Sequence, residues 1–230
     1  MKKLLTAAIG SILFATAAFA EPTLSMTGEG RVGVAPDVAL VRIGVQTRAE
    51  EATTALNRNS ASANALIMAA RNGGVEARDI QTSGLSLQPF YVNGRDGGEA
   101  KLAGFSVSNE VAVRVRKVDA LGEILGALVG AGANMINGIE FGVADMGAAM
   151  DETRRAAVAD ARRKAELYAE AAGVTLGPII SIAEWGGGSQ GMMGAMAAQS
   201  VYEMAPVPVE AGEMTLFTNV SVVWSIKGAE

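Results

Sequence analysis

Hydrophobic periodicity constrains this chain most, because it switches repeatedly between a two-residue repeat and a repeat of three to four residues. Apolar residues at every second position are typical of strands, and apolar residues three and four apart are typical of amphipathic helices. Strand-like alternation covers residues 24–34, 39–45, 79–92, 105–115, 136–143, 176–185 and 216–226, and helical repeats cover residues 50–72, 119–130 and 147–172. The predicted order is therefore β-β-α-β-β-α-β-α-β-β. Because hairpins dominate this order, we expect an α+β fold with a mostly antiparallel sheet and three helices packed on one face.

The first two strand-like segments are joined by Pro36 and Asp37, which are both common turn residues. Their apolar positions are in phase, so they predict a β-hairpin. The strand that contains Leu24 carries few charges along its edge. An exposed, uncharged edge invites pairing with another chain, so we expect this edge to contribute to self-association.

A second hairpin is predicted from residues 79–92 and 105–115. The apolar phase slips at Gly84, which favours a β-bulge at that position. Two junctions between a helix and a strand, at residues 69–75 and 171–174, have similar sequences. Either an internal β-α-β duplication or the general likeness of such junctions accounts for them.

Each predicted helix has an apolar stripe, and the second and third helices each have a candidate capping residue. Asp119 is a candidate N-cap for the second helix, and Gly173 is a candidate C-cap for the third. Charged residues cover the other faces of the third helix, where Glu166 can pair with Arg162 or Arg163 at helical spacing. The expected stripes are Ala52, Leu56, Ala63, Leu66, Ile67 and Ala70 in the first helix, Leu121, Leu125 and Leu128 in the second, and Val158, Ala161, Ala165, Tyr168 and Ala172 in the third.

The amino terminus has the features of a secretory signal peptide. Two lysines precede an uncharged apolar run over residues 4–19, and Ala18-Phe19-Ala20 matches an A-x-A cleavage site. The run is too short for a membrane anchor. We therefore expect the chain to be exported and residues 1–20 to be removed by cleavage between Ala20 and Glu21.

The remaining chain, residues 21–230, is long enough to form one domain with a substantial core. Its longest apolar stretch, residues 124–136, is interrupted by three glycines and an asparagine, so no integral membrane span is expected. Peripheral association with the outer membrane stays open. The formal net charge of −5 and the lack of a basic cluster argue against nucleic acid as a partner.

The chain contains no histidine and no cysteine. This composition excludes zinc sites of the usual kind, Ser-His-Asp triads, cysteine nucleophiles and covalently attached haem. The carboxylates Glu140, Asp145 and Glu184 show no spacing typical of an acid/base pair or a calcium loop. Residues 28–33 match the pattern GxGxxG, but the alternation continues through them, so they predict a glycine-containing strand instead of a dinucleotide site. We therefore assign no catalytic residue and no cofactor.

Residues 186–213 predict a glycine- and methionine-rich loop. With Met214 directly after it, this region holds five of the eleven methionines: Met192, Met193, Met196, Met204 and Met214. Thioethers suit Cu(I), react with oxidants, and also adapt well to apolar contacts between subunits. A contact with a second subunit or a mobile cover is the leading interpretation, and Met192, Met193 and Met196 are the candidate ligands if the loop binds Cu(I).

Several short motifs follow one another in order along nearly the whole chain after residue 20. They are Gly28-x-Gly30, Pro36-Asp37-x-Ala39, Asn59, Asp79-Ile80-Gln81-Thr82, Ser86-Leu87-x-Pro89-x-Tyr91, Asn109-x-Val111-x-Val113, Gly132-Ala133-Asn134-x-Ile136-x-Gly138-Ile139, Asp160-Ala161-Arg162-x-Lys164-Ala165 and residues 207–213. In these motifs the chain resembles the SIMPL-domain family. The resemblance implies an exported α+β protein of the periplasmic-antigen or oxidative-stress-defence type that self-associates and has no established reaction or catalytic residues.

Together, the residues and the resemblance predict a non-catalytic periplasmic protein. We expect it to form a homo-oligomer and to support envelope or oxidative-stress tolerance. The alternative is a periplasmic binding module for a small ligand or Cu(I), with the methionine-rich loop at its site.

Overall fold

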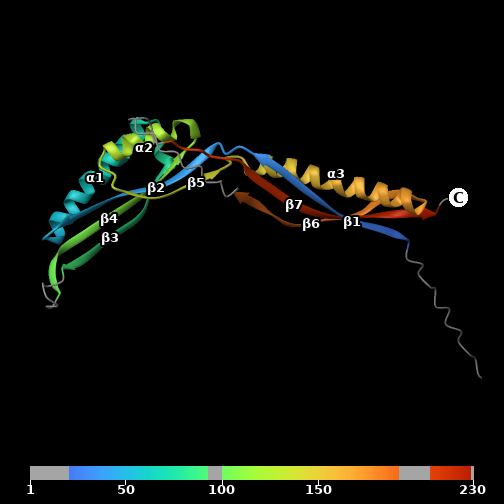
Figure 1. Ribbon diagram of the computed structural model, residues 1–230, viewed down its shortest axis with the longest axis horizontal. Coiled ribbons are helices and arrows are strands. Elements are labelled where there is room, and N and C mark those ends of the chain that lie inside the picture. Colours follow the sequence, from blue (N-terminus) through green and yellow to red (C-terminus); the bar gives the residue numbers. More distant parts are fainter. Residues whose placement is uncertain (1–20, 93–99, 192–207, 229–230) are drawn as a thin grey trace, which may run out of the picture.

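The computed structural model describes residues 21–92, 100–191 and 208–228, in which two antiparallel sheets lie end to end (Figure 1). Each sheet has helices on one side, so the predicted α+β class and the predicted order of strands and helices are confirmed. The strands are β1 (Thr23–Val34), β2 (Val38–Ala49), β3 (Ile80–Val92), β4 (Lys101–Val115), β5 (Met135–Gly142), β6 (Val174–Gly191) and β7 (Met214–Gly228), and the helices are α1 (Ala52–Asn72), α2 (Leu121–Gly130) and α3 (Met146–Ala172).

The four-stranded half has the strand order β3-β4-β2-β5 and is covered by α1 and α2 (Figure 1). Its core joins Val41 and Ile43 of β2 with Val111 of β4 and the three predicted leucines of α2, all of which are buried. The hairpin between β3 and β4 is confirmed, and the register shifts beside Gly84 as the slip in phase predicted. Burial of this apolar set accounts for the folding of this half.

A buried asparagine joins α1 to the sheet. Asn59 is fully buried, and its Nδ2 donates hydrogen bonds to the carbonyl oxygens of Val45 (2.8 Å) and Val107 (3.0 Å) on adjacent strands. The Thr47 hydroxyl of β2 donates to the Ala55 carbonyl oxygen of α1 at 2.9 Å. These bonds fix the height and rotation of α1 above the sheet, which apolar contacts alone leave loosely specified.

The three-stranded half has the order β1-β7-β6, with α3 on one face. The buried residues of α3 recur at every fourth position, from Thr153 to Ala169. The expected stripe is therefore partly wrong: Ala161 and Ala165 are buried, but Tyr168 is 57% exposed. A continuous row of small residues lets α3 lie close to the sheet, which accounts for the difference.

Two glycines of β1 set this close contact. A Cβ atom at Gly28 would lie 2.5 Å from the Ala161 nitrogen, and one at Gly30 would lie 2.9 Å from the Ala157 nitrogen. Glycine in a strand often marks such a close approach of another backbone. The GxGxxG pattern therefore serves strand–helix packing, and its glycines open no helix.

The predicted hairpin between β1 and β2 is wrong. β1 pairs with β7, where Thr23 lies opposite Ser225, whereas β2 pairs with β4 and β5. At the junction, the Asp37 nitrogen donates to the Gly142 carbonyl oxygen at 3.1 Å, and the Ala144 nitrogen donates to Asp37 Oδ1 at 2.7 Å. These bonds hold the junction where the chain passes from one sheet to the other, so Pro36 and Asp37 do not form a hairpin turn.

Two local expectations also change. The residue before α2 is Ala120, with no side-chain cap, and Asp119 belongs to a short 3-10 turn over Val118–Ala120, so Asp119 is not an N-cap. The predicted loop starts later than expected, because β6 continues to Gly191 opposite the start of β7. Gly173 does end α3 in the left-handed conformation, as predicted.

Candidate functional site

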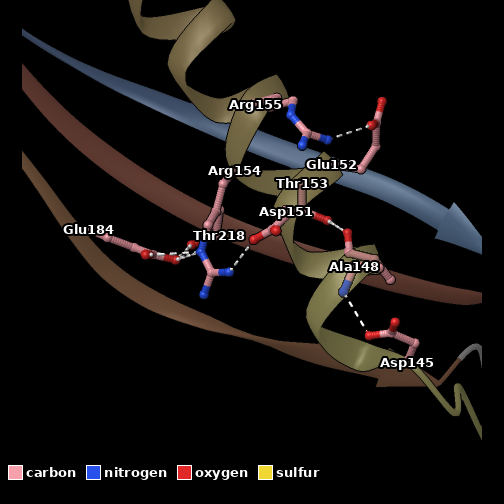
Figure 2. A network of polar contacts seen from close by, with 10 residues as sticks. Asp145, Ala148, Asp151, Glu152, Thr153, Arg154, Arg155, Glu184 and Thr218 are labelled. Atoms are coloured by element: carbon pink, nitrogen blue, oxygen red, sulfur yellow. Dashed lines mark hydrogen bonds and ion pairs between the residues drawn. The ribbon is translucent and has the colours of Figure 1, made fainter.

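Most charged side chains of α3 are paired. Arg154 binds Glu184 of β6 through two contacts of 3.0 and 3.1 Å and Asp151 through one of 2.9 Å (Figure 2). The Thr218 hydroxyl of β7 donates to the same Glu184 carboxylate at 3.1 Å. The predicted pair between Arg162 and Glu166 is also present, at 2.9 Å. This arrangement ties the helix to the sheet and leaves no free carboxylate pair for acid/base chemistry along it.

Two side chains of α3 bind the outer edge of β1 near the middle of the strand. The Glu29 nitrogen donates to Asp160 Oδ2 at 3.0 Å, and Lys164 donates to the Thr27 carbonyl oxygen at 3.0 Å. Lys164 and Asp160 also form an ion pair at 2.7 Å. Lys164 first, and then the Glu29 nitrogen, hold the pKa of Asp160 far below its usual value. Paired charges at this edge work against the strand pairing that the sequence predicted for it.

The three isolated carboxylates from the sequence lie on different elements. Glu140 of β5 binds Arg42 at 2.7 Å, Asp145 accepts a hydrogen bond from the Ala148 nitrogen as the N-cap of α3, and Glu184 binds Arg154. Each is a structural contact. Across residues 21–92, 100–191 and 208–228, no three or more Asp and Glu side chains gather in a way that would hold a metal ion.

Two further carboxylates have pKa values lowered by hydrogen bonds. Arg116 donates two bonds to Asp79, at 2.6 and 2.8 Å, and lowers its pKa. Ser83 and Asn137 both donate to Glu110, and the two bonds lower the pKa of Glu110. Such groups stay ionised at neutral pH, so they are poor proton donors for catalysis.

A cavity of about 350 Å³ lies on the face of the three-stranded sheet that α3 does not cover. Side chains directly opposite each other in antiparallel strands point to the same side. Glu29, Asn219 and Trp185 form one such row across β1, β7 and β6, and Arg31 and Phe217 belong to the next row. All five line the cavity. Sequence reasoning missed this site because its residues come from three strands that are far apart in the chain.

A second apolar surface of β6 is formed by three isoleucines, two of which lie on the opposite face from the cavity. Ile179 and Ile182 pair with Trp224 and Val222, whose side chains point toward α3, and Ile180 occupies a bulge between them. The three isoleucines, which we call the β6 strip, are between 46% and 54% exposed. They are exposed because α3 lies mainly over β1 and β7.

The candidate copper ligands Met192, Met193 and Met196 lie outside the described residues, as do the predicted signal peptide and Met204. Met214 is the first residue of β7. Among the described helices, none has the length and apolar character needed to cross a membrane.

Comparison with protein families gives a match over residues 24–224 to the model named SIMPL, described as a protein of unknown function (DUF541). This match covers both sheets and all three helices. The chain belongs to the SIMPL family. The resemblance in the short motifs is thereby confirmed.

Two kinds of relative are similar to this SIMPL protein. The 26 kDa periplasmic immunogenic protein of Brucella melitensis is 34% identical over 211 residues, which cover 89% of this chain and 84% of the relative. The uncharacterized protein YggE of Escherichia coli K12 is 29% identical over 161 residues, which cover 70% of this chain and 65% of the relative. Neither name states a reaction.

Proposed function

We propose that this SIMPL protein is exported to the periplasm, works without catalysis, and self-associates to support envelope or oxidative-stress tolerance. The single observation that carries the proposal is the β6 strip at an edge of the three-stranded sheet. Large contiguous apolar patches are rare on monomeric proteins, and where they occur they commonly mark a contact with another protein.

Export is supported by the charged and apolar pattern of residues 1–20 and by the word "periplasmic" in the name of the Brucella relative. The test is amino-terminal sequencing of the protein recovered from a periplasmic fraction. Export with cleavage gives Glu21 as the first residue, whereas a chain that retains Met1 in a membrane fraction contradicts it. The same fractions show whether the product associates peripherally with the outer membrane.

We expect self-association to use the β6 strip and not the edge of β1 that the sequence suggested. The outer edge of β1 is occupied by Asp160 and Lys164, whereas β6 is the other edge strand of the same sheet. A second copy that packs against Ile179, Ile180 and Ile182 covers their apolar surface, and burial of that surface favours association by about 25 cal/mol per Å².

The decisive measurement is the mass of the processed protein in solution by light scattering at micromolar concentration. We expect a species several times heavier than one chain. Replacement of both Ile180 and Ile182 by lysine is expected to reduce the mass, because buried unpaired charge opposes packing. The matched control is Leu167→Lys on α3, where the side chain is 57% exposed and lies outside the strip.

A monomeric wild-type protein refutes self-association. A double variant that keeps the wild-type mass shows that the contact lies elsewhere and refutes the role of the strip. For stress tolerance, peroxide survival of cells that lack the gene is compared after complementation with wild type, the double variant and Leu167→Lys. Wild type and the control are expected to restore survival, and the double variant is not.

A further inference from the structure

Trp185 has an exposure that packing within the chain does not explain. It is 55% exposed on the face of β6 that points away from both α3 and the β6 strip, whereas Trp224 in the same sheet is 3% exposed. The next residue, Gly186, has a φ of +64° and lies at a shift of register. Bulges of this kind often direct a side chain beside a binding site.

Glycine also opens space beside the second aromatic ring. Gly188 lies opposite Phe217, and the ring atoms of Phe217 are 3.5 Å from the point where a side chain at position 188 would begin. Because no side chain stands there, the Phe217 ring extends toward β6 on the same face as Trp185. The two rings therefore line one shallow cavity.

The rim of this cavity is polar and close to neutral. Glu29 and Arg31 project from β1 with their charged groups 3.5 Å apart, and both are more than half exposed. Asn219 lies between Glu29 and Trp185 in its row. The rim thus offers a carboxylate acceptor, a guanidinium donor and an amide that does both.

We propose that this cavity binds a saccharide, with Trp185 and Phe217 against the C–H face of a sugar ring and with Glu29, Arg31 and Asn219 bound to its hydroxyl groups. A pyranose ring has an apolar face and a hydroxyl-bearing rim, which matches an aromatic wall beside mixed donors and acceptors. The volume of about 350 Å³ is near the lower end of small-molecule sites and accommodates one or two sugar rings.

Charge separates this ligand class from two others. An anion such as phosphate meets the Glu29 carboxylate beside the one guanidinium, so the rim gives it little net attraction. A quaternary ammonium favours aromatic rings and carboxylates, but Arg31 repels it. A neutral saccharide uses every group on the rim and meets no repulsion.

The test is a titration of the processed wild-type protein with maltotetraose, cellotetraose and chitotetraose, followed by tryptophan fluorescence and by saturation-transfer NMR. Choline and inorganic phosphate are titrated in parallel. Because Trp224 is buried, a fluorescence change reports mainly on Trp185. We expect at least one oligosaccharide to saturate with a Kd below about 5 mM, and Trp185→Ala to weaken it at least about tenfold.

The matched control is Tyr168→Ala, which removes an equally exposed aromatic side chain from α3 and should leave the affinity within about twofold. If circular dichroism shows that Trp185→Ala is misfolded, Asn219→Ala takes its place with the same expected direction. Absence of saturation by all three oligosaccharides, tighter binding of choline or phosphate, or an unchanged Kd in the folded variant overturns the proposal.

Self-association is scored separately. Ile182 and the cavity lie on opposite faces of β6, and neither Ile180 nor Ile182 lines the cavity, so the double lysine variant should still bind the oligosaccharide. Trp185→Ala should keep the wild-type mass in light scattering. If Trp185→Ala forms a lighter assembly than wild type and wild type binds no oligosaccharide, this face is a subunit contact and the saccharide site is refuted.

Discussion

Replacement of Gly28 by alanine tests whether α3 depends on backbone contact with β1. The new Cβ atom would overlap the Ala157 carbonyl oxygen most closely, and it would also lie 2.5 Å from the Ala161 nitrogen and 2.7 Å from the Ala161 Cβ atom. Ordinary contacts of this kind need about 3.5 Å, so α3 has to move by at least about 1 Å. The obstructing atoms include helix backbone, which cannot change rotamer to make room.

The cost follows from this movement. Overpacking in a core costs about 1–3 kcal/mol, and a rigid backbone obstacle places this site at about 3 kcal/mol. For a chain of this length, 1 kcal/mol shifts the Tm by about 2–4 °C, so Gly28→Ala should lower the Tm by about 6–12 °C. Both tryptophans, Trp185 and Trp224, belong to the three-stranded sheet, so tryptophan fluorescence follows the affected half directly.

Gly84→Ala is the matched control, because the nearest atom to its new Cβ atom is 3.8 Å away, which is an ordinary contact. It should change the Tm by less than about 3 °C. Thermal melts of the two variants, recorded by fluorescence and by circular dichroism, are compared with wild type. If Gly28→Ala has the same Tm as Gly84→Ala, the close packing of α3 on β1 is refuted.

Two further outcomes follow from paired or buried polar groups, and a third follows from the composition of the chain. Because the pKa of Asp160 is lowered in the folded protein, its carboxylate stabilises the fold above the pKa of an unfolded Asp, which is near 4, and this stabilisation is lost as the pH falls below that value. Asp160→Asn should therefore flatten the fall in Tm between about pH 5 and pH 2.5. Asn59→Ala should lower the free energy of unfolding by about 2–3 kcal/mol in urea titrations, because two buried bonds are lost; a cost below about 0.5 kcal/mol would contradict their importance. Treatment with EDTA should leave the Tm unchanged, since a chain without His or Cys has no usual structural zinc site; a drop of many degrees would show a required metal.

The sequence was sufficient for features that depend on neighbouring residues. Alternation over 79–92 and 105–115 predicted a hairpin that forms, and the phase slip at Gly84 predicted its bulge. Gly173 predicted the end of α3. In these cases the interacting groups are close in the chain, so local pattern and local geometry agree.

Features that depend on distant partners were not predictable in this way. Alternation shows which face of β1 is buried but not which strand lies beside it, and its partner β7 is at the other end of the chain. The same limit hides the saccharide-site candidates, because Trp185 gains its neighbours only through β7. It also hid the cover on the β1 edge, which Asp160 and Lys164 supply from a helix about 130 residues later.

The pairing of β1 with β7 has a consequence for when the protein can fold. Thr23 lies opposite Ser225, so the three-stranded sheet can form only when two segments about 200 residues apart in the chain come together. The β3–β4 hairpin joins segments that are close in the chain, so its formation closes a much shorter loop. Because contacts between distant segments slow folding, we expect the three-stranded half to form later than the β3–β4 hairpin.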